Sequence, residues 1–170
     1  MNLEFTNTIP DNINLQPILI SEATSINYKH QIFIVEYNNK IATSLYQIKY
    51  QIHSSSFKEV MKIKNILAVG HEEYFYLYNT TTNTNILSLT MNGYFGHLYY
   101  NTKIFYVTDA TGIYCINKTG NIIWHNDELG IDGVIINDFI DNTIVGNGDF
   151  DPPGGWIDFS INKETGIKIL

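Results

Sequence analysis

Arginine is absent from this chain of 170 residues, and cysteine occurs only once. Proteins that bind nucleic acids normally neutralise phosphates with cationic side chains and use arginine for bidentate contacts with bases. The missing arginine therefore argues against nucleic acid as a ligand. A single cysteine, Cys115, cannot form an intramolecular disulfide, which suits a reducing compartment. It lies in the aliphatic run 113–116, where a buried and unreactive thiol is expected.

The chain also lacks the segments that direct proteins to membranes. No apolar run approaches the length of a membrane span, and the first residues have neither the basic start nor the apolar core of a secretory signal. We therefore expect a cytoplasmic protein without membrane association.

The net charge of −7 is concentrated in the last third of the chain. Residues 1–108 contain seven carboxylates and seven lysines, whereas residues 109–170 contain ten carboxylates and three lysines. An acidic surface of this kind suits a basic protein partner, because complementary charge steers association. The alternative is that the acidity only keeps the protein soluble.

Residues 66–170 contain three similar segments made of short runs rich in isoleucine, tyrosine and phenylalanine. The copies cover residues 66–103, 104–143 and 144–170, and the last run that they share, at 85–89, 121–124 and 167–169, contains isoleucine and is expected to form a strand. A repeat of about 40 residues built from short strands is typical of propeller blades. We therefore predict one all-β domain with antiparallel sheets in blade-like repeats, forming a small or incomplete β-propeller-like fold.

Residues 1–65 diverge from the repeat but also favour strands. Residues 31–37 are expected to form a strand, Asn38 and Asn39 a hairpin turn, and residues 40–52 one or two returning strands, since polar and apolar residues alternate there. Residues 1–30 are expected to hold one or two edge strands and loops.

Residues 57–63 fit either two helical turns or a strand, and their position next to the repeat favours a strand. The whole chain then contains about four blade-like units, which predicts a small closed ring or an open stack of sheets.

Two turns support this arrangement. The segments 117–120 and 162–166 each run from asparagine to glycine between two isoleucine-containing strands, and the glycine supplies the positive φ of a tight hairpin. Such hairpins resemble the outer-strand turns of quinoprotein-like (PQQ-like) repeats over residues 66–170. The resemblance implies that these repeats fold as propeller-like blades. It does not imply the cofactor, because cofactor-binding quinoproteins are much longer and complete a ring, so no cofactor is expected.

One link between strands departs from the repeat. The links 71–73 and 109–112 of the first two copies are short, whereas the third copy has Asn-Gly-Asp-Phe-Asp-Pro-Pro-Gly-Gly at 147–155, followed by Trp156. The two prolines restrict φ, and the two glycines that follow them allow special geometry, so a shaped and stiff loop is expected. Its Asp-Pro-Pro-Gly-Gly-Trp motif resembles small bacterial proteins with propeller-like or WD-like repeats. Some of these resemble immunity proteins of polymorphic toxin systems.

This loop also has structural interpretations. It can serve only to reverse the chain direction between two strands, with Trp156 packed in the core. Tryptophan is found more often in cores than on binding surfaces. Asn147, Asp149 and Asp151 alternate like the start of a calcium loop, but two prolines and the missing closing glutamate disagree with that pattern. We expect no metal site.

Nothing in the chain predicts an enzyme. The histidines are scattered without metal-ligand spacing, and neither a nucleophile elbow nor a phosphate-binding glycine loop occurs. The five histidines are His30, His53, His71, His97 and His125. Catalytic sites can still assemble from distant residues.

The expected function is therefore a cytoplasmic protein-binding module. The resemblance of the loop implies an immunity protein that occludes the active site of a basic toxin domain. The alternative is a small-ligand or carbohydrate-acting protein that uses the same face. The predicted partner-binding residues are acidic or aromatic and lie on the loop side of the last two repeats: Asp127, Glu128, Asp132, Asp149, Phe150, Asp151 and Trp156.

Overall fold

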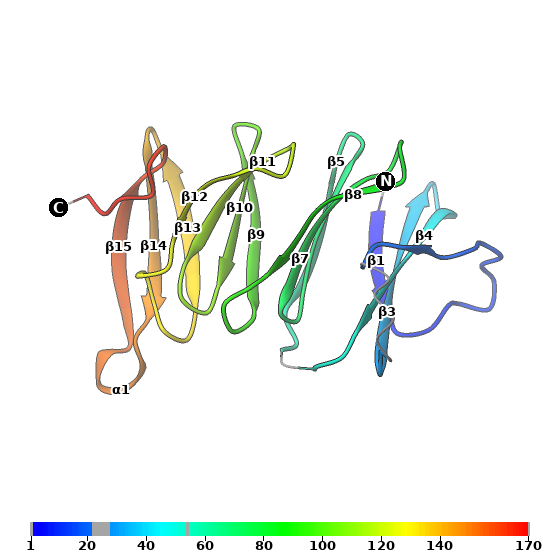
Figure 1. Cartoon of the computed structure of the whole chain (residues 1–170), viewed down its shortest axis with the longest axis horizontal. Helices are drawn as coiled ribbons and strands as arrows, with labels where there is room; N and C mark the ends of the chain where they lie inside the picture. The colour runs from blue at the N-terminus through cyan, green and yellow to red at the C-terminus, as the bar shows by residue number, and fades with distance from the viewer. Residues whose placement is uncertain (1, 22–27, 54, 170) are drawn as a thin grey trace.

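The computed structural model describes residues 2–21, 28–53 and 55–169 and consists of four sheets stacked in chain order (Figure 1). The first sheet has the spatial order β1 (Asn2–Thr6), β3 (His30–Asn38), β4 (Ile41–Tyr50) and β2 (Ile18–Leu19). The second comprises β5 (Lys58–Ile63), β6 (Ile66–His71), β7 (Tyr74–Asn79) and β8 (Thr84–Thr90). The third comprises β9 (Phe95–Asn101), β10 (Ile104–Asp109), β11 (Ile113–Asn117) and β12 (Ile122–Asn126). The last comprises β13 (Val134–Ile140), β14 (Thr143–Asp149) and β15 (Trp156–Asn162).

The predicted all-β class with antiparallel, blade-like sheets is confirmed; the short strand β2, which pairs with β4 in parallel, is the exception to antiparallel pairing. Residues 58–63 form β5, so the strand interpretation of that segment is correct. The hairpin between β3 and β4 turns at Asn39 and Lys40, both with positive φ, one residue later than predicted. Strands β1 and β2 are the edge strands expected near the N-terminus, while residues 22–27 of that segment lie outside the described residues.

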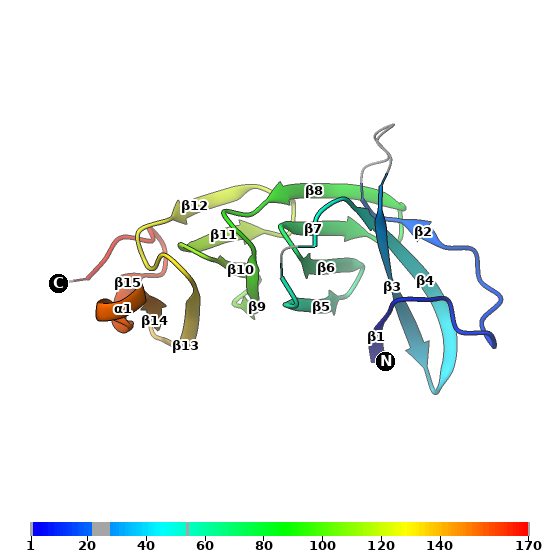
Figure 2. The same cartoon turned by 90° about the horizontal axis from the view of Figure 1, so that it is seen from below.

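The sequence repeat is offset from the sheets by one strand. Residues 66–103 span β6, β7 and β8 of the second sheet together with β9, which belongs to the third. The sheets fan out as an open arc, with β8 and β12 along one side and β5, β9 and β13 along the other (Figure 2). Of the two predicted arrangements, the open stack is the one observed, and β1 and β15 belong to the sheets at opposite ends of the arc (Figure 1).

The core lies between successive sheets. On β7, Phe75 and Leu77 pack toward the third sheet, whereas Tyr76 and Tyr78 pack toward the first. All four are buried, because a central strand with a sheet on each side has both of its faces covered. A further cluster around Trp124 fills the space between the third and last sheets.

The outer face of the first sheet is covered as well. Phe33, Val35 and Leu45 are buried there beneath Ile13 and Leu15, which come from the segment that follows β1. The N-terminal end of the stack therefore has an apolar cover provided by the chain itself.

The predicted glycine turns are confirmed. Gly120 has φ of +83° and Gly166 has φ of +71°, and the side chains of Asn117 and Asn162 accept backbone hydrogen bonds that close the two hairpins. In the described part of the chain, no helix is long and apolar enough to cross a membrane.

Candidate functional site

From β6 onward, every second connection between successive strands lies at one end of the stack, at the bottom of Figure 1. We call it the link end. We call the opposite end the hairpin end, which contains the turns 39–40, 64–65, 80–83, 102–103, 118–121, 141–142 and 163–166. The link end contains residues 72–73, 91–94, 110–112, 127–133 and 150–155. All seven predicted partner-binding residues lie at this end or at the strand termini beside it.

The link of the last sheet is longer than its counterparts, as predicted, but begins later. Asn147 and Asp149 belong to β14, and only residues 150–155 leave the sheet. They include one helical turn, α1 (Asp151–Gly154), and are closed by a 3.0 Å hydrogen bond from the Phe150 amide to the Gly155 carbonyl.

The side chain of Asn147 is engaged across the sheet. Its amide oxygen, the atom that a calcium loop would use, accepts a hydrogen bond from Asn137, and its amide nitrogen donates one to Asp158. Within residues 2–21, 28–53 and 55–169, no group of His, Cys, Asp or Glu side chains could hold a metal ion.

Backbone hydrogen bonds hold the two C-terminal links together. The carbonyl of Asp149 accepts from the amides of Ile131 at 2.7 Å and Asp132 at 3.3 Å, and the Asp149 amide donates to Gly133 at 2.9 Å. Gly148 permits this approach, since a Cβ at that position would lie 1.6 Å from the Leu129 carbonyl oxygen. Asp132, Asp149, Phe150, Asp151 and Trp156 therefore form one surface region, which we call the acidic corner.

The link 127–133 is also anchored to the third sheet. The amides of Leu129 and Gly133 donate to the carbonyls of Thr111 and Ala110 at 3.0 and 2.8 Å. The link 110–112 is in turn fixed by the fully buried carboxylate of Asp109. That carboxylate accepts hydrogen bonds from the backbone amides of Asn92 at 3.0 Å, Thr111 at 2.9 Å and Gly112 at 2.7 Å. The sequence placed Asp109 only at the start of the short link 109–112, whereas in the structure it supports the neighbouring site.

Trp156 is 53% exposed, so the interpretation of this residue as a core anchor is wrong. Phe159 and Ile161 of β15 pack against the third sheet, and alternation places Trp156 and Asp158 on the opposite face. No sheet of the described residues covers that face. The buried tryptophan is Trp124, which is 9% exposed and donates its indole N–H to the Lys163 carbonyl at 3.1 Å.

The acidic corner has negative charge, and its carboxylates form no ion pair with a cation in the part of the chain that the structure describes. The ion pairs among the described residues involve Glu36, Glu59 and Glu72, and none involves a carboxylate of the last third of the chain. The negative charge of the corner affects Tyr94. Burial raises the pKa of its hydroxyl, and the charges of Asp132 and Asp149 raise this pKa further. The same hydroxyl donates to the Asp132 carbonyl at 2.7 Å.

Asp127 and Glu128 are exposed on the same link but outside the acidic corner. The charge of Asp127 contributes to the raised pKa of Tyr114, after burial and Asp109. The Lys168 ammonium donates to the Glu128 carbonyl at 2.9 Å. The structure thus divides the predicted site residues into two neighbouring groups.

Three of the scattered histidines meet at the link end of the first two sheets. The His30 ring stacks on Tyr50 with centroids 5.4 Å apart, and the Tyr50 ring contacts His71 at 4.4 Å. His53 Nδ1 lies 2.7 Å from the buried carboxylate of Glu72, and His71 Nε2 lies 3.6 Å from it. Burial lowers the pKa of His71 to about 4, although the charge of Glu72 opposes that shift.

Cys115 is buried as expected. Burial raises the pKa of its thiol to about 11, which disfavours the reactive thiolate.

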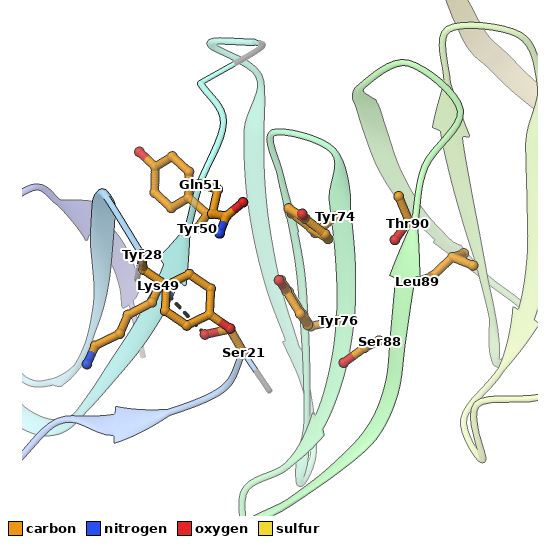
Figure 3. A pocket seen from close by; sticks show the side chains of 10 residues that line it. All are labelled: Ser21, Tyr28, Lys49, Tyr50, Gln51, Tyr74, Tyr76, Ser88, Leu89 and Thr90. Atoms are coloured by element: carbon orange, nitrogen blue, oxygen red, sulfur yellow. Dashed lines mark hydrogen bonds between the residues drawn. The ribbon is translucent and has the colours of Figure 1, made fainter. Parts of the chain in front are cut away.

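A cavity of about 310 Å³ lies between the first and second sheets (Figure 3). Tyrosine rings and hydroxyl groups dominate its walls: Tyr28, Tyr50, Tyr74, Tyr76, Ser21 and Ser88. In Figure 3 the ammonium group of Lys49 points away from the tyrosines of the second sheet. The cavity is remote from the acidic corner, so a ligand there would not use the face predicted from the sequence.

Among the solved structures compared with this chain, BamB supports the fold. BamB from Moraxella catarrhalis superposes with a TM-score of 0.54 at 9% identity, over 81% of this chain and 42% of BamB. The AfRom2 CNH domain gives 0.49 at 14% identity, over 84% and 47%, and Hsv2p from Kluyveromyces lactis gives 0.43 at 9%, over 82% and 56%. The chain thus spans less than half the length of BamB, and the likeness shows a propeller-like fold alone. No family model and no curated protein matches the chain.

Proposed function

We propose that this chain is a cytoplasmic protein-binding module that holds a basic protein partner on its acidic corner. The observation that carries the proposal is an exposed tryptophan, Trp156, beside the carboxylates of Asp132, Asp149 and Asp151, which lack ion-pair partners among the described residues. Tryptophan is over-represented among residues that dominate binding energy, and uncompensated carboxylates accelerate association with cations.

The fixed geometry of the corner favours the same function. Hydrogen bonds between Asp149 and the link 127–133 order both loops before any partner arrives. A site that is ordered in advance loses less conformational entropy on binding.

The more specific proposal is that the partner is a toxin domain and that the chain is its immunity protein. It is supported by the acidic charge and by the resemblance of the Asp-Pro-Pro-Gly-Gly-Trp segment at 151–156. The mechanism is steric occlusion of the toxin's active site, with charge complementarity accelerating the encounter.

The test uses the protein encoded next to this chain's gene as the candidate partner. The variant Asp149→Asn/Asp151→Asn is compared with Asp141→Asn/Glu164→Gln, which removes two exposed carboxylates from turns at the hairpin end. At low salt the first variant is expected to slow association about tenfold, and the control is expected to behave like the parent.

Protection of cells that produce the candidate toxin is measured with the same variants. Equal association rates for the two variants, or an association rate independent of ionic strength, would show that the corner is not the binding site. Tight binding without protection would retain the binding module and reject the immunity role.

A second candidate function, binding of a small ligand such as a carbohydrate, is favoured by the tyrosine-lined cavity in Figure 3. Its volume of about 310 Å³ lies at the lower end of the range typical of ligand sites. Neutral mono- and disaccharides are titrated while intrinsic fluorescence is recorded. A saturable response that Tyr74→Ala removes supports this function, and the absence of any response rejects it.

A further inference from the structure

The last sheet has three strands, whereas each of the other sheets has four. The run 167–169, expected to form its outer strand, covers only the hairpin end of β15. The Asn162 amide donates to the Ile167 carbonyl and the Ile169 amide to the Ser160 carbonyl, both at 2.8 Å. Only Lys168 forms a bridge, with Ile161.

The remaining length of β15 is a sheet edge without a partner strand among the described residues. The backbone groups of Ser160 and Asn162 face the outer edge, so those of Trp156 and Asp158 face it too, because the direction alternates along a strand. In the second and third sheets, β8 and β12 occupy the corresponding position. An unpaired edge of this kind is a template for one more strand.

A cavity of about 350 Å³ lies at this edge, where a fourth strand would continue from Ile169. Its apolar wall consists of Leu129 and Phe150 from the two links together with Ile157, Phe159 and Ile169, and the cavity is also lined by Asp158, Ser160 and Lys168. Leu129 is buried, whereas Ile157 and Ile169 are 48% and 47% exposed. Exposed aliphatic side chains beside an unpaired sheet edge provide apolar area that an added strand can bury.

The two sides of the edge differ in chemistry, and this defines the occupant. One side offers the apolar residues of the cavity, and the other offers the indole of Trp156. Asp158, whose side chain lies on the same face as Trp156 by alternation, also lines the cavity at the edge, as does Lys168. Successive side chains of an added strand point to opposite sides. Aliphatic residues would enter the cavity, while lysine or arginine would lie against Trp156 and Asp158 through cation–π and charge interactions.

The geometry points to β15 as the docking edge for an extended segment of a basic protein, in which aliphatic residues alternate with lysine or arginine. This inference rests on the proposed function and specifies how the basic partner is held. The added strand would complete the four-stranded sheet and reach the acidic corner through Trp156.

The probe is a capped heptapeptide of alternating lysine and valine, added to the full chain while Trp156 fluorescence and backbone amide NMR shifts are recorded. We expect saturable binding with the largest shifts at residues 156–159. A peptide of alternating glutamate and valine, and one with the valines and lysines in separate blocks, are expected to bind at least about tenfold more weakly.

N-methylation of the lysine–valine peptide tests the strand pairing without altering the protein. An added strand uses the amides along one of its edges, so methylation of one alternate set is expected to weaken binding at least about tenfold. Methylation of the other set is expected to have little effect. Equal effects of the two sets, or no saturable binding of the unmodified peptide, would overturn the proposal.

Ile157→Asp places a charge at the cavity and is expected to weaken binding of the probe, whereas Ile140→Asp, at an equally exposed isoleucine near the hairpin end, is expected to leave it unchanged. Sedimentation tests the alternative occupant. A dimer of the parent chain that Ile157→Asp dissociates would assign the edge to a second copy and reject this proposal. If the probe fails while Asp149→Asn/Asp151→Asn still slows association of the candidate partner, only the strand-docking inference is wrong.

Discussion

Replacing Asp109 with asparagine tests the support beneath the acidic corner. One carboxylate oxygen accepts the amides of Thr111 and Gly112, and the other accepts the amide of Asn92. An asparagine can orient its oxygen toward only one of these groups. Its amide N–H₂ would then face a backbone N–H, because both are hydrogen-bond donors.

The expected cost follows from this geometry. The better orientation keeps the two bonds to Thr111 and Gly112 without the charge and leaves the buried Asn92 amide unsatisfied. An unsatisfied buried donor costs about 1–3 kcal/mol, and loss of charge weakens the other bonds. We expect Asp109→Asn to lower the free energy of unfolding by about 3 kcal/mol, a large part of the 5–15 kcal/mol typical of a domain.

Urea denaturation followed by tryptophan fluorescence measures this change, with Asp141→Asn as a charge-matched control. Asp141 is exposed in a hairpin turn and has φ of 49°, which asparagine adopts readily, so the control is expected to stay within about 0.5 kcal/mol of the parent. Hydrogen exchange should also accelerate at the Leu129 amide, which bonds to Thr111. Equal stability of Asp109→Asn and Asp141→Asn would refute the role assigned to Asp109.

Three further predictions concern stability and reactivity. Trp124→Ala is expected to cost about 3–5 kcal/mol and Trp156→Ala about 1 kcal/mol, because the first residue is 9% and the second 53% exposed; equal costs in urea denaturation would contradict this. The pKa of His71 is lowered from 6.5 to about 4 in the folded protein. As pH falls from 6.5 to 4, the His71 imidazole therefore becomes protonated in the unfolded state but stays neutral in the folded state. Stability should decline there by up to about 3 kcal/mol, and a pH profile of His71→Leu as steep as the parent's would contradict the assignment. The Cys115 thiol, whose pKa is raised to about 11, should react with a disulfide reagent at the rate of unfolding, and rapid labelling of the native protein would show that it is accessible.

The strands and hairpins were predictable because their causes are local. Alternation along residues 40–52 anticipated β4, and the asparagine-to-glycine segments 117–120 and 162–166 anticipated two turns. Positive φ at a glycine and side-chain hydrogen bonds within a few residues do not depend on the rest of the fold. The longer link in the last sheet was visible for the same reason, as an insertion into a repeat.

By itself, then, the sequence determined the all-β class, the repeat and the acidity of the last third of the chain. Only the tertiary structure decided that Trp124 is buried while Trp156 is exposed, because burial depends on whether another sheet covers a face. It also brought His30, His53 and His71 together across two sheets, through contacts that no sequence spacing encodes. The partial pairing of β15 has the same origin: the run 167–169 has the composition of a strand, but only the structure shows that it bonds to the hairpin end of β15 alone.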